Sequence, residues 1–370
     1  MVGLIREKMK RVYFILLLAV AATTAATAGK PIQTNDVWRH PGAERTNCRR
    51  NVCIPDIEGY RTLKCDFHVH TCFSDAQVYP AGRVNEAWND GLDVIAITDH
   101  FEIRKNKGME TADMNLPYEI AAARGREIGM LVISGGEITR HKPFGHINAL
   151  FLKDANRFPR DRTPENEQAA LDEAFAQEAY IFWNHPGWPD DSCTLYPMHE
   201  RLLREGKIHG VEIFNSKEHY PRVLQWYERM DFSMLANSDI HYMSGQQYPD
   251  GVLRPMTLVF AREYTVESVR EALFAGRLVA LYDNTLAGAE KYIRALVGES
   301  LAVRVIDARK GTIELCNKSD IEYSIRYGDY MYPVAIYGHQ TVRLNIPKGT
   351  RVTFVNCVLG YEKYFETELW

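Results

Sequence analysis

The sequence predicts an α/β protein built on a closed parallel barrel, followed by a small all-β region. Three observations support this fold class. Short apolar runs alternate repeatedly with amphipathic stretches, no glycine-rich phosphate loop follows any of these runs, and short β-like runs replace the alternation from about residue 291. About seven strand-helix units favour a barrel over an open doubly wound sheet, although periodicity alone leaves that sheet open.

The expected barrel strands are short and rich in apolar residues, at 63–67, 92–98, 130–134, 146–152, 180–183, 210–214 and 233–236. Helical stretches are expected at 81–90, 118–128, 165–178, 198–205 and 220–230. A further helix at 265–277 begins with Thr265 as its N-cap, and a strand at 278–282 ends the barrel.

The C-terminal region has a different texture, in which Asn, Asp, Gly and Pro separate short β-like runs. These runs are 300–306, 312–316, 322–327, 341–346 and 351–358. We therefore divide the chain into a signal peptide (1–28), an N-terminal extension (29–62), a barrel (63–290) and a small β-sandwich-like domain (291–370).

The first residues have the features of a secretory signal. Arg6, Lys8, Lys10 and Arg11 precede an apolar run at 12–20, and Ala26-Thr27-Ala28 offers small residues for cleavage. An uncleaved anchor or a buried N-terminal helix is the alternative. We expect an exported, periplasmic protein with no membrane span after cleavage.

The composition, with 46% hydrophobic and 25% charged residues and a net charge of -4, is that of a folded soluble protein. No basic run indicates a nucleic-acid-binding surface, and oligomeric state cannot be read from the sequence. Among the seven cysteines, Cys48 and Cys53 could close one small disulfide loop. We interpret Cys65 and Cys72 as packing residues.

His68-Val69-His70 closes the first expected strand. Residues two apart in an extended chain project to the same face, so both imidazoles can reach one metal ion. Metal-ligand residue types also follow or open the other expected strands, namely Asp99-His100, Glu137, His146, His185 and Asp239-Ile240-His241. Because the active sites of parallel barrels form at the strands' carboxyl ends, we expect these side chains to converge in one mouth.

These residues resemble the PHP (polymerase and histidinol phosphatase) family of metal-dependent phosphoesterases, over about residues 63–282. The resemblance lies in Asp66-Phe67-His68-Val69-His70-Thr71, Ser74-Asp75, Thr98-Asp99-His100, Gly136-Glu137, Gly145-His146-Ile147-Asn148, Asn184-His185-Pro186 and Ser238-Asp239-Ile240-His241. It implies a distorted (β/α)7 barrel that holds up to three divalent metal ions.

The resemblance also implies which residues bind each ion. His68, His70, Glu137 and Asp239 would hold the first, with Glu137 bridging to a second that His146 and His185 also hold. Asp75, His100 and His241 would hold the third. Asp99 fits better as a partner of a ligating histidine than as a ligand. Imidazole and carboxylate ligands suit zinc, manganese and iron alike.

Such a site would attract anions, because three divalent ions carry more charge than the three carboxylates among the ligands. A water bridging two ions would be deprotonated near neutral pH and could attack phosphorus. We expect Arg140 and His219 to clamp phosphate and protonate the leaving group, and Arg140, Lys217, Trp188 and Tyr242 to bind substrate. Each could instead be an ordinary loop residue or, for the aromatic side chains, a packing residue.

The sequence therefore predicts an exported metal-dependent phosphodiesterase for small organic phosphodiesters, with activity extending to monoesters. The aromatic residues near the expected rim suit a second substituent on phosphorus, and in this the chain resembles exported PHP-type phosphodiesterases. A phosphomonoesterase of the histidinol-phosphatase type is the nearest alternative. An amidohydrolase-like hydrolase and a non-enzymatic binding protein also stay open.

Overall fold

The computed structural model describes residues 49–109, 111–249, 252–329 and 332–370, and Arg49–Trp370 forms one compact unit. The expected signal peptide, most of the expected N-terminal extension and the Cys48 half of the expected disulfide lie outside the described residues. No helix in the described ranges is long and apolar enough to span a membrane.

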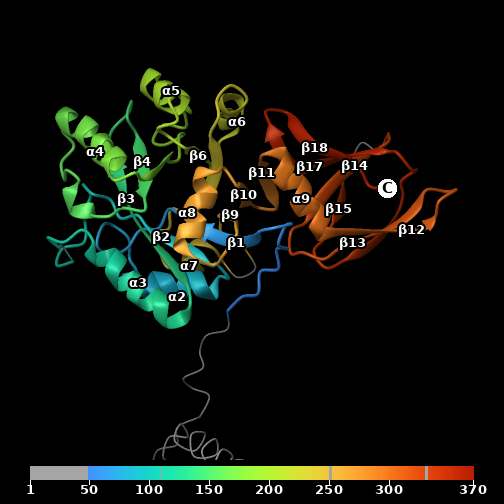
Figure 1. The fold of residues 1–370 in the computed structure, drawn as a ribbon, viewed down its shortest axis with the longest axis horizontal. Coiled ribbons are helices and arrows are strands. Elements are labelled where there is room, and N and C mark those ends of the chain that lie inside the picture. The colour runs from blue at the N-terminus through green and yellow to red at the C-terminus, as the bar shows by residue number, and fades with distance from the viewer. Residues whose placement is uncertain (1–48, 110, 250–251, 330–331) are drawn as a thin grey trace, which may run out of the picture. The chain divides into compact units, whose positions relative to one another are not determined.

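Seven strands and their connecting helices match the expected alternation closely (Figure 1). The strands are β1 (Arg61–Asp66), β2 (Val94–Ile97), β3 (Leu131–Thr139), β4 (His146–Leu150), β5 (Tyr180–Trp183), β6 (Gly210–Asn215) and β8 (Ser233–Asn237). The helices are α2 (Pro80–Asn89), α3 (Leu116–Ile128), α4 (Pro164–Ala176), α5 (Pro197–Arg204) and α6 (Pro221–Tyr227). Each of these five helices has a proline in its first turn, where the missing N–H costs no hydrogen bond.

The sheet is mixed, which corrects the expectation of an all-parallel barrel. Strands β1, β2 and β3 pair in parallel, but β4 pairs antiparallel with both β3 and β5. The reason is the length of the connection. Residues 140–145 between β3 and β4 are too few for a crossover helix, so β4 must return alongside β3.

The two ends of this run of strands come together just beyond β1 and β8. Val69 and Ile240 form a parallel bridge. The Phe67 N–H donates to Asn237 Oδ1 at 2.9 Å, and the His70 N–H donates to the Ile240 carbonyl at 3.3 Å. The segments that follow β1 and β8, which carry His68, His70 and Asp239, are therefore held side by side.

On its other edge β1 pairs antiparallel with β9 (Met256–Ala261), which continues through β10 (Leu278–Tyr282) to β11 (Thr285–Gly288). The helix α8 (Val266–Phe274) lies between β9 and β10 in sequence, and the Thr265 side chain caps it as expected, by accepting from the Ser268 N–H. Strands β9 and β11 were not predicted. Short elements complete this part: η1 (Ala155–Arg157), β7 (Glu218–His219) and α7 (Ser244–Gln247).

The C-terminal residues begin with a helix that the sequence analysis missed, α9 (Glu290–Ser300), and continue as strands. These are β12 (Leu301–Asp307), β13 (Thr312–Asn317), β14 (Tyr323–Tyr327), β15 (Val334–Ile336), β16 (Thr341–Asn345), β17 (Arg351–Gly360) and β18 (Lys363–Glu368). Strands β12, β13 and β16 form a separate three-stranded sheet, whereas β17 pairs in parallel with β11 and so continues the larger sheet (Figure 1).

One hydrophobic cluster runs from the barrel-side strands into the C-terminal strands. It includes Leu258 and Val279 together with Ile313, Ile325 and Phe354, all fully buried. Cys65 is also fully buried, in agreement with its interpretation as a packing residue.

Candidate metal centre

The nine residues assigned as metal ligands in the sequence analysis lie together. They fall into four overlapping groups, and within each group the possible ligand atoms are within 4.8 Å of one another. The groups are His70, Asp75, His100 and His241; His68, His70 and Glu137; His68, His185 and Asp239; and Glu137, His146 and His185.

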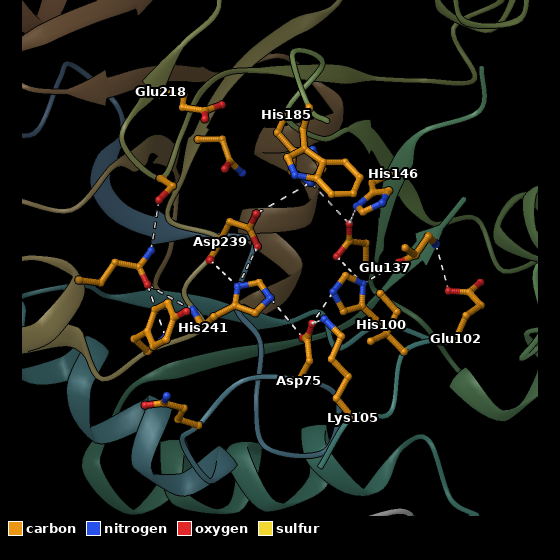
Figure 2. Close-up of a pocket in the computed structure, with 18 of the residues that line it drawn as sticks. Asp75, His100, Glu102, Lys105, Glu137, His146, His185, Glu218, Asp239 and His241 are labelled. Carbon is orange, nitrogen blue, oxygen red and sulfur yellow. Dashed lines mark hydrogen bonds and ion pairs between the residues drawn. The ribbon is translucent and has the colours of Figure 1, made fainter. Parts of the chain in front are cut away.

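Two carboxylates occupy the middle of the cluster (Figure 2). The Nε2 atoms of His68 and His70 lie 3.3 and 3.2 Å from Glu137 Oε2, and 3.3 and 3.1 Å from Asp239 Oδ1. The other oxygen of Glu137, Oε1, lies 2.7 Å from His146 Nδ1 and 3.7 Å from His185 Nε2. Glu137 therefore faces two sets of imidazoles with its two oxygens, as a bridging ligand would.

A third carboxylate, Asp75, lies at one side of the cluster. Its Oδ1 is 3.2 Å from His241 Nε2 and 3.5 Å from His100 Nε2 (Figure 2). Its other oxygen, Oδ2, is 3.2 Å from the ammonium group of the exposed Lys105.

The antiparallel return of β4 explains how His146 reaches the cluster from the start of a strand. Thr139 at the end of β3 pairs with His146, and Glu137 pairs with Asn148. Gly145 precedes His146 with φ +74°, a conformation that favours glycine. Gly136 precedes Glu137, and a Cβ there would lie 2.2 Å from the buried Phe101 ring.

Two ligand candidates have unusual backbones. His185 has φ +22° and Asp239 has φ +48°, although neither is a glycine. Such conformations cost about 1–3 kcal/mol and concentrate at functional sites, because the surrounding structure must hold them. Each of the two residues lies two positions beyond the carboxyl end of a strand, β5 for His185 and β8 for Asp239.

The residues fit divalent metal ions, as their hydrogen bonding shows. The buried side-chain atoms without a hydrogen-bond partner include His70 Nε2, Asp75 Oδ1, Glu137 Oε1, His146 Nδ1 and Asp239 Oδ1. Buried polar atoms rarely lack partners. The concentration of these unpartnered atoms in one place indicates that they donate their lone pairs to bound cations. Imidazoles with carboxylates form a donor set suited to zinc, manganese or iron.

Charge coupling within the cluster is strong. Burial opposes a charge on His70, but the negative charges of the adjacent Asp239 and Glu137 carboxylates outweigh it and raise the pKa of His70 from 6.5 to about 9. Burial dominates at His146 and lowers its pKa to about 4. Burial also opposes the charge on Glu137, yet His100, His146 and His68 hold its pKa well below 4.5. The carboxylates are therefore ionised and ready to bind cations.

The cluster lies at a cavity of about 1280 Å³, whose lining includes seven of the nine residues. Lys217, Trp188 and Tyr242, which we expected to bind substrate, also line this cavity. Trp188 is 53% exposed, and its ring centroid lies 4.9 Å from that of His146.

A smaller recess of about 60 Å³ adjoins the cavity, and His146, His185 and Trp188 line both. Its other lining residues include Trp183, Tyr196, Pro143, Pro186 and Pro189. These aromatic and proline side chains give the recess a largely apolar wall beside the second set of imidazoles, although Arg140, His141 and Lys142 also line it.

The two residues chosen for proton transfer and phosphate clamping are placed differently from the ligands. Arg140 lines the cavity, but its guanidinium group is buried, forms an ion pair with Glu102 and donates to the Thr139 and Asn166 carbonyls. His219 is exposed on β7, its ring lies against Phe214, and it is not among the cavity-lining residues found in the described part of the chain.

Asp99 stabilises the loop that carries Asp75. Its carboxylate accepts from the Thr71 N–H, the Thr71 hydroxyl and the Ser74 hydroxyl, each at 2.6 Å. Asp99 therefore accepts hydrogen bonds from the loop residues Thr71 and Ser74, whereas we expected it to accept from the imidazole of a ligand histidine.

A carboxylate outside the nine ligand candidates, Glu212, faces a ligand imidazole, and the sequence analysis missed it. Glu212 Oε1 lies 2.9 Å from His68 Nδ1, and both residues are fully buried. The available signal was a carboxylate in the middle of the apolar strand Gly210–Asn215, since charged groups are almost never fully buried unless paired.

Comparisons with known proteins agree with this geometry. A two-domain protein from Bacteroides vulgatus, described as containing a predicted PHP-like metal-dependent phosphoesterase, is 31% identical and superimposes with a TM-score of 0.81. The match covers 87% of this chain and 99% of that one. An uncharacterized protein of Methanocaldococcus jannaschii is 28% identical over 165 residues, which are 42% of this chain and 82% of that protein. No protein-family model matches the chain.

Proposed function

Because the chain belongs to the PHP family of metal-dependent phosphoesterases, we propose that its nine-residue centre binds three divalent ions and hydrolyses phosphoesters. The observation that carries this proposal is the convergence of six imidazoles and three carboxylates, several with unpartnered atoms, beside one cavity. Zinc, manganese and iron are the candidate metals. Bound there, the ions would activate water for attack on phosphorus and neutralise the phosphoryl oxygens.

The residues of the chain would supply the rest of the chemistry. His68, His70, Glu137 and Asp239 would hold the first ion, Glu137, His146 and His185 the second, and Asp75, His100 and His241 the third. Lys217 lines the cavity and is exposed, so it can approach a substrate anion. The Arg140 guanidinium, which is committed to Glu102, would support the cavity wall and not the phosphate.

We assign small organic phosphodiesters as the preferred substrates. A diester carries a second substituent on phosphorus, and such a group needs room and apolar surface. The cavity offers the room, and the recess beside His146 and His185, together with the exposed Trp188, offers the apolar surface.

A phosphomonoesterase is the second candidate, and the cations of the cavity favour it. Lys105, Lys217 and Arg162 line the same cavity and would suit the additional charge of a monoester dianion. Activity on the monoester products of diester cleavage is compatible with both candidates.

We propose that β1–β6 and β8, joined at the Val69–Ile240 bridge, act as the distorted (β/α)7 barrel of the family. Residues 291–370 would form the second, β-rich domain. We further propose that residues 1–28 direct export to the periplasm, which fractionation of cells expressing the full chain would test.

The decisive assay compares a nitrophenyl phosphodiester with the matching monoester on protein loaded separately with zinc, manganese and iron. We expect faster diester cleavage that is lost in His68→Ala. Preference for the monoester would favour the second candidate, and equal hydrolysis in the variant and the native protein would refute the assignment of the site.

A further inference from the structure

Glu212 stands out from the other buried carboxylates of the centre by its hydrogen bonding. Glu212 is fully buried on β6, between Val211 and Ile213 in sequence. Its Oε1 faces His68 Nδ1 at 2.9 Å and accepts from Asn237 Nδ2 at 2.9 Å. Its Oε2 accepts from the His185 N–H at 2.8 Å and from Asn215 Nδ2 at 2.7 Å.

These four contacts use the whole acceptor capacity of the group, because an ionised carboxylate has about four lone-pair sites. In contrast, Glu137 Oε1, Asp239 Oδ1 and Asp75 Oδ1 are buried without a hydrogen-bond partner. Glu212 could therefore ligate a metal ion only by losing contacts, whereas the other three carboxylates have free lone pairs. This difference in hydrogen bonding indicates that Glu212 supports the ligands around it and is not itself a ligand.

The contact with His68 determines which ring nitrogen can bind metal. An ionised carboxylate only accepts hydrogen bonds, so Nδ1 of His68 must carry the proton that it donates. In the neutral ring Nε2 is then bare. That atom lies 3.3 Å from both Glu137 Oε2 and Asp239 Oδ1, where a shared cation would remove the repulsion between lone pairs.

The contact with His185 is made by its backbone. The N–H that Glu212 accepts belongs to the residue with φ +22°, a conformation that needs support from its surroundings. His68 and His185 follow different strands, β1 and β5, and are assigned to the first and the second proposed ion. One carboxylate thus holds the ring of one ligand and the main chain of another.

We propose that Glu212 is a positioning residue that fixes the Nδ1–H tautomer of His68 and the backbone of His185, and so sets the geometry of the first two metal sites together. The proposal rests on the metal centre proposed above. Asn237 extends the arrangement, because it donates to Glu212 and accepts from the Phe67 N–H, which ties β8 to the segment leading into His68.

Glu212→Gln tests this role with little change in size. The glutamine amide has two orientations, and each loses a native contact. In one, its NH2 group meets two other donors, the His185 N–H and Asn215 Nδ2. In the other, its NH2 group faces His68 Nδ1 and forces that ring to the opposite tautomer. We expect cobalt(II) affinity at the first two sites to fall about 10- to 100-fold, the range typical of partners behind metal ligands. The visible absorption spectrum of bound cobalt should change as well.

Glu102→Gln is the matched control. Glu102 is also a buried carboxylate at the cavity, but it accepts from the Thr139 N–H and pairs with Arg140. We expect this variant to retain the cobalt stoichiometry and spectrum of the native protein. Unchanged cobalt affinity and spectrum in Glu212→Gln, or the same losses in both variants, would overturn the positioning role.

A measurement on the native protein covers the case in which Glu212→Gln does not fold. In ¹⁵N NMR of the zinc-loaded chain, His68 should carry its proton on Nδ1 and bind zinc through Nε2. Zinc on Nδ1 would contradict the proposal. If the native protein bound no metal at all, the proposed function would fail first, so the two failures can be told apart.

Discussion

His146 Nδ1 lies 2.7 Å from Glu137 Oε1 although the two residues belong to strands that run in opposite directions. The short turn after β3 makes this possible, since it returns the start of β4 to the edge where β3 ends. Glu137 also faces His68 and His70 with its other oxygen. It is therefore the residue through which the first two proposed metal sites are joined.

Glu137→Gln should consequently impair both sites at once. The variant removes a charge that two ions would share, so we expect a loss of hydrolysis greater than the ~10- to 100-fold typical of partners behind the ligands. Metal analysis by mass spectrometry should show fewer than two ions bound per chain. Retention of the full metal content would contradict a bridging role.

The third site should be separable from the first two. Asp75 contacts His100 and His241 but lies at one side of the cluster, so Asp75→Asn should bind one ion fewer per chain and keep the others. Lys105→Gln is the control, because its ammonium group pairs with the same carboxylate without being a ligand type. If both variants lost the same amount of metal, Asp75 would not be a ligand of a separate third ion.

Chelation should destabilise the native protein, because metal binds the folded arrangement of ligands and not the unfolded chain. An ion present at 100 times its dissociation constant contributes about 2.7 kcal/mol to the free energy of unfolding. We expect EDTA to lower the melting temperature measured by calorimetry, and zinc or manganese to restore it. His68→Ala should respond less, and an equal response of the two proteins would argue against these ligands.

Trp188→Ala should affect diesters more than monoesters. The exposed indole lies between the cavity and the apolar recess, where it can stack on an aryl substituent. Such contacts contribute about 0.5–1.5 kcal/mol, so we expect KM for a bis-nitrophenyl diester to rise by roughly 2- to 12-fold, converted at 1.4 kcal/mol per factor of ten. An equal rise in KM for the nitrophenyl monoester would indicate that Trp188 does not contact the second substituent of the diester.

Acid stability should depend on His199, which is not one of the proposed ligands. This fully buried ring stacks on Trp183 with centroids 3.8 Å apart and donates from Nε2 to the Phe144 carbonyl at 2.8 Å. Burial lowers its pKa from 6.5 to about 4. Between these values the unfolded chain binds a proton that the folded protein excludes, so stability falls as the pH drops below 6.5 and levels off near 4.

From pH 7 to pH 5 this single group should cost about 2 kcal/mol of unfolding free energy. His199→Gln can still donate to the carbonyl but does not titrate. Urea denaturation at the two pH values should therefore show a smaller pH dependence in the variant, whatever its overall stability. The same pH dependence in both proteins would exclude His199 as the source.

The sequence was informative wherever a local pattern determined the outcome. Tyr180–Trp183 and Leu278–Tyr282 are strands with the expected bounds, because short apolar runs between turn signals leave few alternatives. The nine ligand candidates could be chosen because their residue types recur at strand ends in a recognisable order. Their convergence followed from the barrel expectation, even though the direction of β4 did not.

What the sequence could not provide was geometry between distant segments. Nothing in the run around Glu212 indicates that its carboxylate meets His68, 144 residues away. Arg140 and His219 were chosen as cationic or titratable residues beyond strand ends, but a loop's direction depends on its packing. The pairing of Arg140 with Glu102 and the position of His219 on an exposed two-residue strand are visible only in three dimensions.

The most direct test of the central claim is anomalous diffraction from crystals of the protein loaded with zinc or manganese, recorded on both sides of the metal's absorption edge. We expect three peaks among the nine residues, with Glu137 beside two of them. Metal bound elsewhere in the crystal, with no peak beside Glu137 and Asp239, would contradict this claim.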